Sequence, residues 1–205
     1  MKLQTLHRFS GVFISLFVAL HLANHAVSVA GAEQHIALMQ TLRLIYRNAF
    51  AETLLLLAVL FQIISGVKFF IKGKTTPVAK TPTLQLQRYS GLYLALFLIV
   101  HVGAVMAGRY VLELDTNFYF GVAGLNTFPL NLFFVPYYAL AIIAFFGHIA
   151  AIHHLKMQRT IIGLTPTFQS LLILVFGILL TVVILYGLTN GFGGVEIPKE
   201  YELLK

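Results

Sequence analysis

Two histidines preceded by the same residue types lie inside long apolar runs. His21 follows the run Leu6-His-Arg-Phe-Ser-Gly11, and His101 follows Gln87-Arg-Tyr-Ser-Gly91. Each histidine comes 13 residues after the arginine of its run, which is about 20 Å along a helix. Two helices that run in the same direction would bring both imidazoles to one level. Because ionisable groups inside a membrane are costly and usually face the bundle interior, we expect the pair to form a functional site.

Two imidazoles at one level on different helices can hold one iron from opposite faces of a flat macrocycle. Haem b fits such a pair, because imidazole is a common axial ligand and a porphyrin takes an apolar slot between helices. Ala104 and Gly108, on the face of His101, are predicted to leave room for the ring. Zinc is the alternative metal, but it usually takes three or four ligands including a carboxylate or thiolate. The chain has no cysteine, and its one candidate intramembrane acid is Glu52, near a helix end.

A second level of polar residues is incomplete. His148 lies 16 residues after Leu132, about 24 Å along a helix that descends from the other side. Gln62 falls at the matching depth on another helix. Since glutamine is a poor haem ligand, a second haem at this level would be five-coordinate, differently ligated or absent.

The remaining histidines carry weaker predictions. His25, with Asn24 and Ser28, continues the polar face of the first helix, where it could bind a haem propionate, a quinone or water. His153 and His154 lie at a helix end and are predicted to be interfacial. His35 falls in a polar link and is predicted to be a surface histidine.

The composition places these residues in a membrane. Of the 205 residues 59% are hydrophobic and 10% are charged, and the mean hydropathy is +0.86, far from the range of soluble domains. Five apolar runs reach the roughly 20 residues that a spanning helix needs; they cover 9–30, 49–71, 89–107, 132–153 and 168–188. We therefore predict one all-α domain over residues 1–205, an integral membrane bundle of five transmembrane helices with haem held within a four-helix core.

The basic residues predict an orientation. With the N-terminus inside, nine Lys and Arg residues lie on the inner side and five on the outer side, which favours N-in and C-out. All seven acidic residues then lie outside. The basic segment from Lys68 to Arg88 could also meet acidic lipid head groups or a soluble partner, although it equally fits a plain topology signal.

Together, the five helices, the two runs leading to His21 and His101, Gln62-x-x-x-Gly66, and His148 resemble the cytochrome b membrane-anchor subunit of succinate:quinone oxidoreductases and fumarate reductases. The single-polypeptide, two-haem type is the closest likeness, and it extends from Leu6 to about Leu188. The resemblance implies a subunit of the cytoplasmic (inner) membrane that anchors a flavoprotein and an iron–sulfur protein at its inner face. It also implies electron transfer between the iron–sulfur protein and quinone through haem b.

The same resemblance assigns roles residue by residue. His21 and His101 match the ligands of the outer haem, and His148 matches one ligand of the inner haem. Gln62 stands where the family has the partner histidine, which puts the inner haem in doubt.

Quinone sites are predicted at both ends. Thr5, His7, Arg8 and Ser10 resemble the start of the first helix in related subunits, where a hydroxyl and an arginine line a quinone site. Such groups can hydrogen-bond a quinone carbonyl and stabilise charge on it. Arg8 also stands where an interfacial anchor is expected. Glu52 is a candidate proton carrier for an outer quinone site.

The chain itself is not expected to oxidise succinate, because it has no dinucleotide-binding glycine loop after a strand and no soluble domain for a dicarboxylate. Two other functions remain open: a stand-alone membrane cytochrome b that serves another dehydrogenase, and a haem-free transporter or assembly protein. Transporters often contain inverted repeats, whereas the repeat here is parallel. No nucleic-acid partner is predicted.

Overall fold

A computed structural model describes residues 2–75 and 81–205, and within them the regular elements are helices. Five helices are long and apolar enough to cross a membrane. They are α1 (Leu3–Val27), α3 (Ala49–Thr75), α4 (Pro82–Tyr110), α6 (Asn131–Lys156) and α7 (Pro166–Leu188). The all-α class and the five spans are thus confirmed. Most of the helices extend beyond the predicted runs, because a helix continues through interfacial polar residues where an apolar run stops.

Two of the long helices begin at the same short motif. Thr81 precedes Pro82 at the start of α4, and Thr165 precedes Pro166 at the start of α7. Each threonine side chain accepts a hydrogen bond from the backbone N–H three residues on, at 3.3 Å in α4 and 3.4 Å in α7. Proline suits the first helical position because the N–H it lacks would have no partner there.

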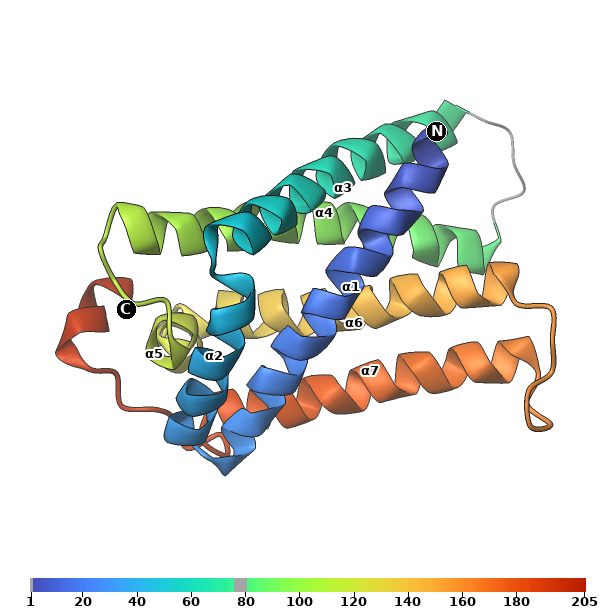
Figure 1. The fold of residues 1–205 in the computed structure, drawn as a ribbon. Coiled ribbons are helices and arrows are strands. Elements are labelled where there is room, and N and C mark those ends of the chain that lie inside the picture. The colour runs from blue at the N-terminus through green and yellow to red at the C-terminus, as the bar shows by residue number, and fades with distance from the viewer. Residues whose placement is uncertain (1, 76–80) are drawn as a thin grey trace.

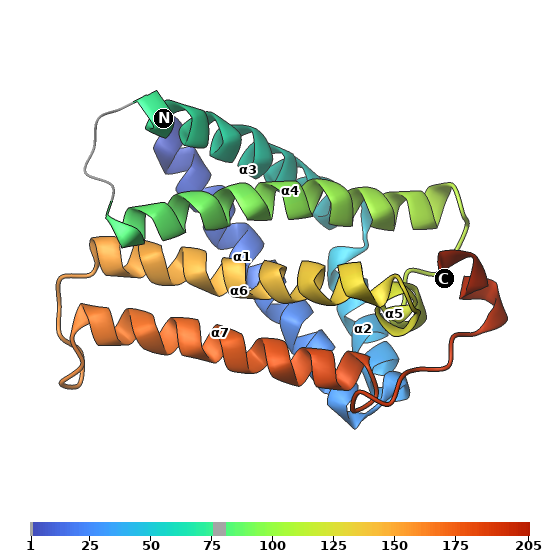
Figure 2. The same cartoon turned by 180° about the vertical axis from the view of Figure 1, so that it is seen from behind.

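The long helices are arranged as a layer crossed by one oblique helix. Figure 2 shows α4, α6 and α7 side by side, with α1 passing behind them. Helix α3 packs beside α4, and α1 packs against both α3 and α7. In Figure 1, α1 meets α3 near the N-terminus of the chain and reaches α7 at its own other end. The middle of α1 therefore faces the layer, and His21, the first histidine of the repeated pair, lies in the second half of this helix.

A cap of short elements closes the end of the bundle that is opposite the N-terminus (Figure 1). The cap comprises α2 (Ala32–Tyr46), α5 (Phe118–Val122), the 3₁₀ turn η2 (Gly124–Asn126) and η3 (Lys199–Leu204), and the 3₁₀ turn η1 (Ser28–Ala30) leads into it. Its apolar side chains form one buried cluster with residues of α1, α6 and α7. Tyr201, which is 1% exposed, donates its hydroxyl to the carbonyl of Asp115 at 3.0 Å. Burial raises the pKa of Tyr201 to about 12.

The cap corrects the prediction of plain links between spans. Residues 31–48 and 108–131 contain α2 and α5. Both helices have buried residues, and the other face of α2 is largely polar and exposed. In the basic segment from Lys68 to Arg88, α3 extends to Thr75 and α4 begins at Pro82. Pro77 and Lys80 of this segment lie outside the described residues.

Replacing Gly187 by alanine should destabilise the bundle. A methyl group there would lie 2.6 Å from the backbone nitrogen of Val29 and 2.8 Å from the carbonyl carbon of Ser28, where α7 meets η1. Overpacking of this kind costs about 1–3 kcal/mol, and each kcal/mol lowers the Tm by roughly 2–4 °C in a chain of this size. Thermal unfolding in detergent measures the shift.

Gly103→Ala is the matched control, since a methyl group on this α4 glycine meets nothing within 4 Å among the described residues. Both changes replace a helical glycine, so the propensity gain is common to them. Equal Tm values for the two variants would contradict the close approach of α7 to η1.

Candidate functional site

His21 of α1 and His101 of α4 lie side by side inside the bundle. Their ring centroids are 6.0 Å apart, and the ring planes are inclined by 68°. Aromatic side chains wall the pair: Phe17 stacks on His21 at 5.7 Å and Phe97 stacks on His101 at 5.0 Å. The edge of Tyr138 from α6 reaches His101 at 6.3 Å. The matching spacings in the sequence predict this shared level, whereas the role of the two imidazoles as ligands stays a prediction.

The donor set and its walls suit a bis-imidazole iron. Two imidazoles that bind one metal through opposed nitrogens, each about 2 Å from it, have ring centres about 6 Å apart. The 6.0 Å separation of the ring centres matches this value, but the rings meet in an edge contact and would have to turn for their nitrogens to oppose each other. The aromatic walls suit the apolar faces of a porphyrin. In the structure Nε2 of His21 lies 3.1 Å from Nε2 of His25, so ligation through that nitrogen would replace this hydrogen bond.

The small residues predicted to leave room for a ring have other surroundings. The ring of Phe120 from α5 packs against Gly108. Ala104 has an exposed side chain. Gly108 therefore serves the packing of the cap, and Ala104 lies at the bundle surface.

A ladder of histidines leads from His21 into the cap. His25 contacts His21 with ring centroids 4.5 Å apart, and His35 of α2 contacts His25 at 5.1 Å. Nδ1 of His25 lies 3.2 Å from Nε2 of His35, and the amide nitrogen of Asn24 lies 3.2 Å from the same atom. Ser28 donates to the backbone carbonyl of His25.

The prediction of a surface position for His35 was wrong. Its side chain is 2% exposed, and the ring of Phe118 packs against it at 5.2 Å. The sequence hid this because a polar link was expected where α2 forms. Burial, together with the charges on His21 and Arg43, lowers the pKa of His35 to about 4, so its ring is neutral at neutral pH.

Two buried polar atoms of this ladder have no hydrogen-bond partner in the structure. They are Oδ1 of Asn24 and Nδ1 of His35. Since most buried polar groups in proteins are hydrogen-bonded, such atoms call for an explanation.

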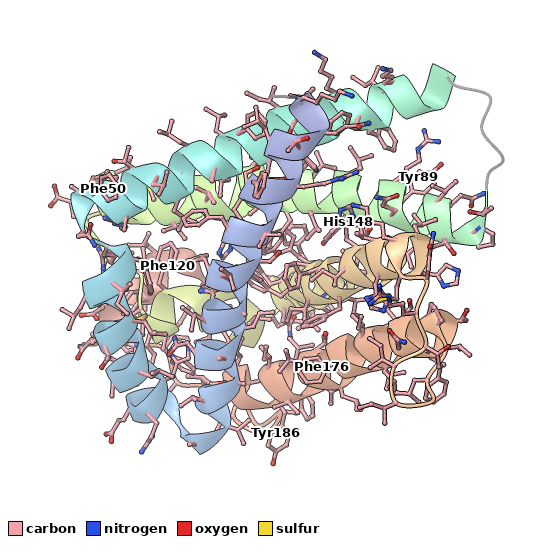
Figure 3. The ribbon with its side chains drawn as sticks, turned by 45° about the vertical axis from the view of Figure 1, so that its right-hand side comes forward. Phe50, Tyr89, Phe120, His148, Phe176 and Tyr186 are labelled. Atoms are coloured by element: carbon pink, nitrogen blue, oxygen red, sulfur yellow. The ribbon has the colours of Figure 1, made fainter. Side chains whose placement is uncertain are left out.

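At the second level Gln62 and His148 make equivalent contacts. Gln62 of α3 donates to the carbonyl of His7, at 2.5 Å, and to the hydroxyl of Ser10, at 2.9 Å. His148 of α6 lies between α6 and α4 (Figure 3), with Nδ1 2.9 Å from the carbonyl of Gln87 and 3.1 Å from the hydroxyl of Ser90. His7 and Gln87 each precede the arginine of the repeated run, so the repeat in sequence is also a repeat in contacts.

Glycine makes both contacts possible. An added methyl group on Gly11 would lie 3.0 Å from the amide nitrogen of Gln62, and one on Gly91 would lie 3.0 Å from Cε1 of His148. We call Ser10-Gly11 and Ser90-Gly91 the Ser-Gly steps. Each step receives a polar side chain from the next long helix and binds it to the helix backbone.

These contacts give Gln62 and His148 different chemical prospects. The amide nitrogen of Gln62 is committed to α1, which makes the residue a cross-link between α1 and α3. When Nδ1 of His148 donates to the Gln87 carbonyl, Nε2 is left as the basic nitrogen, which is the usual tautomer of a metal-bound histidine. The second level thus holds one potential ligand and one structural amide.

The residues predicted to contact quinone at the N-terminal end have different partners and different exposure. Ser10 is engaged by Gln62 and also donates to the carbonyl of Leu6. Arg8 is exposed and Thr5 is half-buried. His7 joins this group, since its Nδ1 lies 2.6 Å from the hydroxyl of Ser65.

Glu52 lies at the cap end, where it forms an ion pair with Arg109 across α3 and α4. The Arg109 side chain is 14% exposed and that of Glu52 is 19% exposed. Arg43 of α2 pairs with Asp115 at 2.8 Å in the same region. A proton carried by Glu52 would have to break the bond to Arg109, and sequence reasoning did not foresee this partner.

Among the described residues, no group of three or more His, Cys, Asp or Glu side chains is placed to hold a metal ion directly. No protein-family model, curated protein or solved structure matches the chain. The findings therefore show a multi-span membrane protein that contacts lipid, and the likeness to a cytochrome b anchor subunit rests on the residues alone.

Gln62→Leu should weaken the attachment of α1 to α3. Leucine keeps a similar size but cannot donate to the His7 carbonyl or to Ser10, and the loss of such hydrogen bonds costs about 1–2 kcal/mol. We expect a Tm lower by a few degrees in detergent. Gln158→Leu, at an exposed position in the link before α7, should leave the Tm unchanged. If Gln62→Leu melts like the unaltered protein, the cross-link is not a stabilising contact.

Proposed function

We propose that this chain is a membrane cytochrome b that holds haem b between His21 and His101. The observation that carries the proposal is the 6.0 Å separation of the two rings, which come from two helices with the same preceding motif and lie between aromatic walls. The proposal is supported by the combination of equal depth, this ring separation and the repeated motif before each histidine. Haem b would supply reversible one-electron transfer.

The residues around the pair favour electron transfer over binding of a small molecule to the iron. Two axial imidazoles fill both open positions of a haem iron. Phe17, Phe97 and Tyr138 keep the surroundings apolar, and the cap covers the bundle end above them. A dry, rigid site of this kind needs little rearrangement when an electron arrives.

We further propose that the chain is the anchor subunit of a succinate dehydrogenase or fumarate reductase complex. It would pass electrons between an iron–sulfur subunit and membrane quinone, with a flavoprotein as the third member. The support is the likeness of Arg8, Ser10, His21, His101 and His148 to the motifs of that family. The basic residues at the N-terminal end of the bundle support the N-in orientation. They also support a surface for the partner subunits at that end.

One haem per chain is part of the proposal. The amide of Gln62 is bonded to α1, which removes it as a partner for His148. A quinone site at the N-terminal end would use Arg8, Thr5 and Ser10, and Glu52 would serve a site at the cap end after release from Arg109.

The test is a purification of the tagged chain in mild detergent, with haem counted by the pyridine haemochrome assay and flavin measured in the same sample. We expect one haem b per chain, and an amount of flavin in proportion to the haem. Absence of haem would contradict the cytochrome. Haem without flavin or an iron–sulfur protein would favour the stand-alone cytochrome.

Within this experiment His101→Ala should abolish the low-spin haem spectrum, because it removes one axial ligand. His153→Ala is the control, since His153 binds Gln169 between α6 and α7 at the N-terminal end of the bundle. An unchanged low-spin spectrum in His101→Ala would overturn the ligand assignment. His35 is unsuitable as a control, because it belongs to the ladder beside the pair.

A further inference from the structure

Asn24 and His35 form a polar site that is closed and chemically incomplete. Asn24 is 4% exposed and His35 is 2% exposed, so bulk water does not reach them. They are bonded to each other at 3.2 Å, yet Oδ1 of Asn24 and Nδ1 of His35 each lack a partner. An unpaired buried polar group costs about 1–3 kcal/mol. A ligand group that hydrogen-bonds both atoms would remove this cost and would therefore be bound favourably.

The hydrogen bonds define what that group must offer. The Asn24 amide nitrogen can only donate, so Nε2 of His35 is the acceptor of its bond, and Nδ1 of His25, which lies 3.2 Å from the same atom, is then a second donor to it. A neutral histidine carries one proton, which therefore lies on Nδ1 of His35. The site thus presents one free donor, Nδ1–H of His35, and one free acceptor, Oδ1 of Asn24. Its ligand needs one acceptor and one donor.

The position of the site relates it to His21. Two ring contacts, of 4.5 Å from His21 to His25 and of 5.1 Å from His25 to His35, separate it from the proposed iron. A porphyrin edge with its carboxyl side arm covers a comparable distance. The ring of Phe118 packs against His35 at 5.2 Å, and an arm that reaches the site from the histidine pair would pass beside His25.

We propose that Asn24 and His35 bind a carboxyl side arm of the haem held by His21 and His101, an inference that rests on the proposed function. A carboxylic acid group accepts a hydrogen bond from Nδ1–H of His35 through its carbonyl oxygen. Its hydroxyl donates to Oδ1 of Asn24. In this form it satisfies both atoms and brings no uncompensated charge into a closed site. The arm fixes the rotation of the ring about the axis between the two ligands.

The test compares haem with its dimethyl ester, which has the same ring and iron but no carboxyl hydrogen to donate. The full-length chain, produced without haem, is titrated with each compound, and binding is followed by the bis-histidine absorbance. We expect haem to bind about tenfold more tightly than the ester, because one buried hydrogen bond is lost with the ester. Asn24→Leu should bring the ratio of the two affinities towards one.

His35→Leu should weaken the binding of both compounds, since each offers a carbonyl to Nδ1–H. It should also move the side-arm bending bands in the resonance Raman spectrum of the haem. His153→Leu, a histidine removed at the other end of the bundle, should change neither the ratio nor these bands.

The outcomes separate this inference from the proposed function. Equal affinities of the unaltered chain for haem and ester would overturn the inference, and this comparison requires no variant to fold. An unchanged ratio in a folded Asn24→Leu variant would overturn it as well, and would leave a buried water as the occupant. Absence of a bis-histidine spectrum with both compounds would instead overturn the proposed function.

Discussion

Polar side chains inside an apolar bundle must find their hydrogen-bond partners there, because lipid tails supply none. This constraint explains the interior of the molecule. Gln62 and His148 bond to the backbone and hydroxyl of the preceding long helix, and His21, His25 and His35 bond to one another. Gln62, His148 and His35 thereby link one helix to another, whereas His21 and His25 are joined within α1. The helices of the bundle are thus positioned by these contacts as well as by apolar packing.

The level of Gln62 and His148 and the level of His21 and His101 differ in how their polar groups find hydrogen-bond partners. This difference distinguishes structural contacts from the candidate functional site. At the Ser-Gly steps, the amide of Gln62 and Nδ1 of His148 both find partners, so Gln62 is a complete structural contact. At the level of His21 and His101, the ring centroids are 6.0 Å apart in an edge contact, and the ladder beyond them ends in two unpaired atoms. An interior that is satisfied at one level and incomplete at the other is what a ligand-binding bundle requires.

The sequence predicts the parts of this architecture that depend on one helix at a time. Hydropathy locates the five spans, and the equal distance from Arg8 to His21 and from Arg88 to His101 predicts their shared level. The cap could not be predicted in this way. Residues 31–48 have mixed composition, and the burial of His35 depends on Phe118, 83 residues further along the chain.

The same limit applies to contacts between helices. The sequence places Gln62 at the depth of His148. It does not reveal that the Gln62 amide hydrogen-bonds the His7 carbonyl. The ion pair of Glu52 with Arg109 joins the predicted proton carrier to an arginine for which the sequence predicts no role beyond the charge count. Pairings of this kind depend on the rotation of one helix against another, which hydropathy and spacing do not specify.

The central claim is that His21 and His101 share one iron. A cryo-electron microscopy map of the purified, haem-loaded protein tests it most directly. We expect a flat density between α1 and α4, continuous on opposite faces with the side chains of His21 and His101. Density for the two imidazoles in contact with nothing between them, or a haem density joined to other residues, would contradict it.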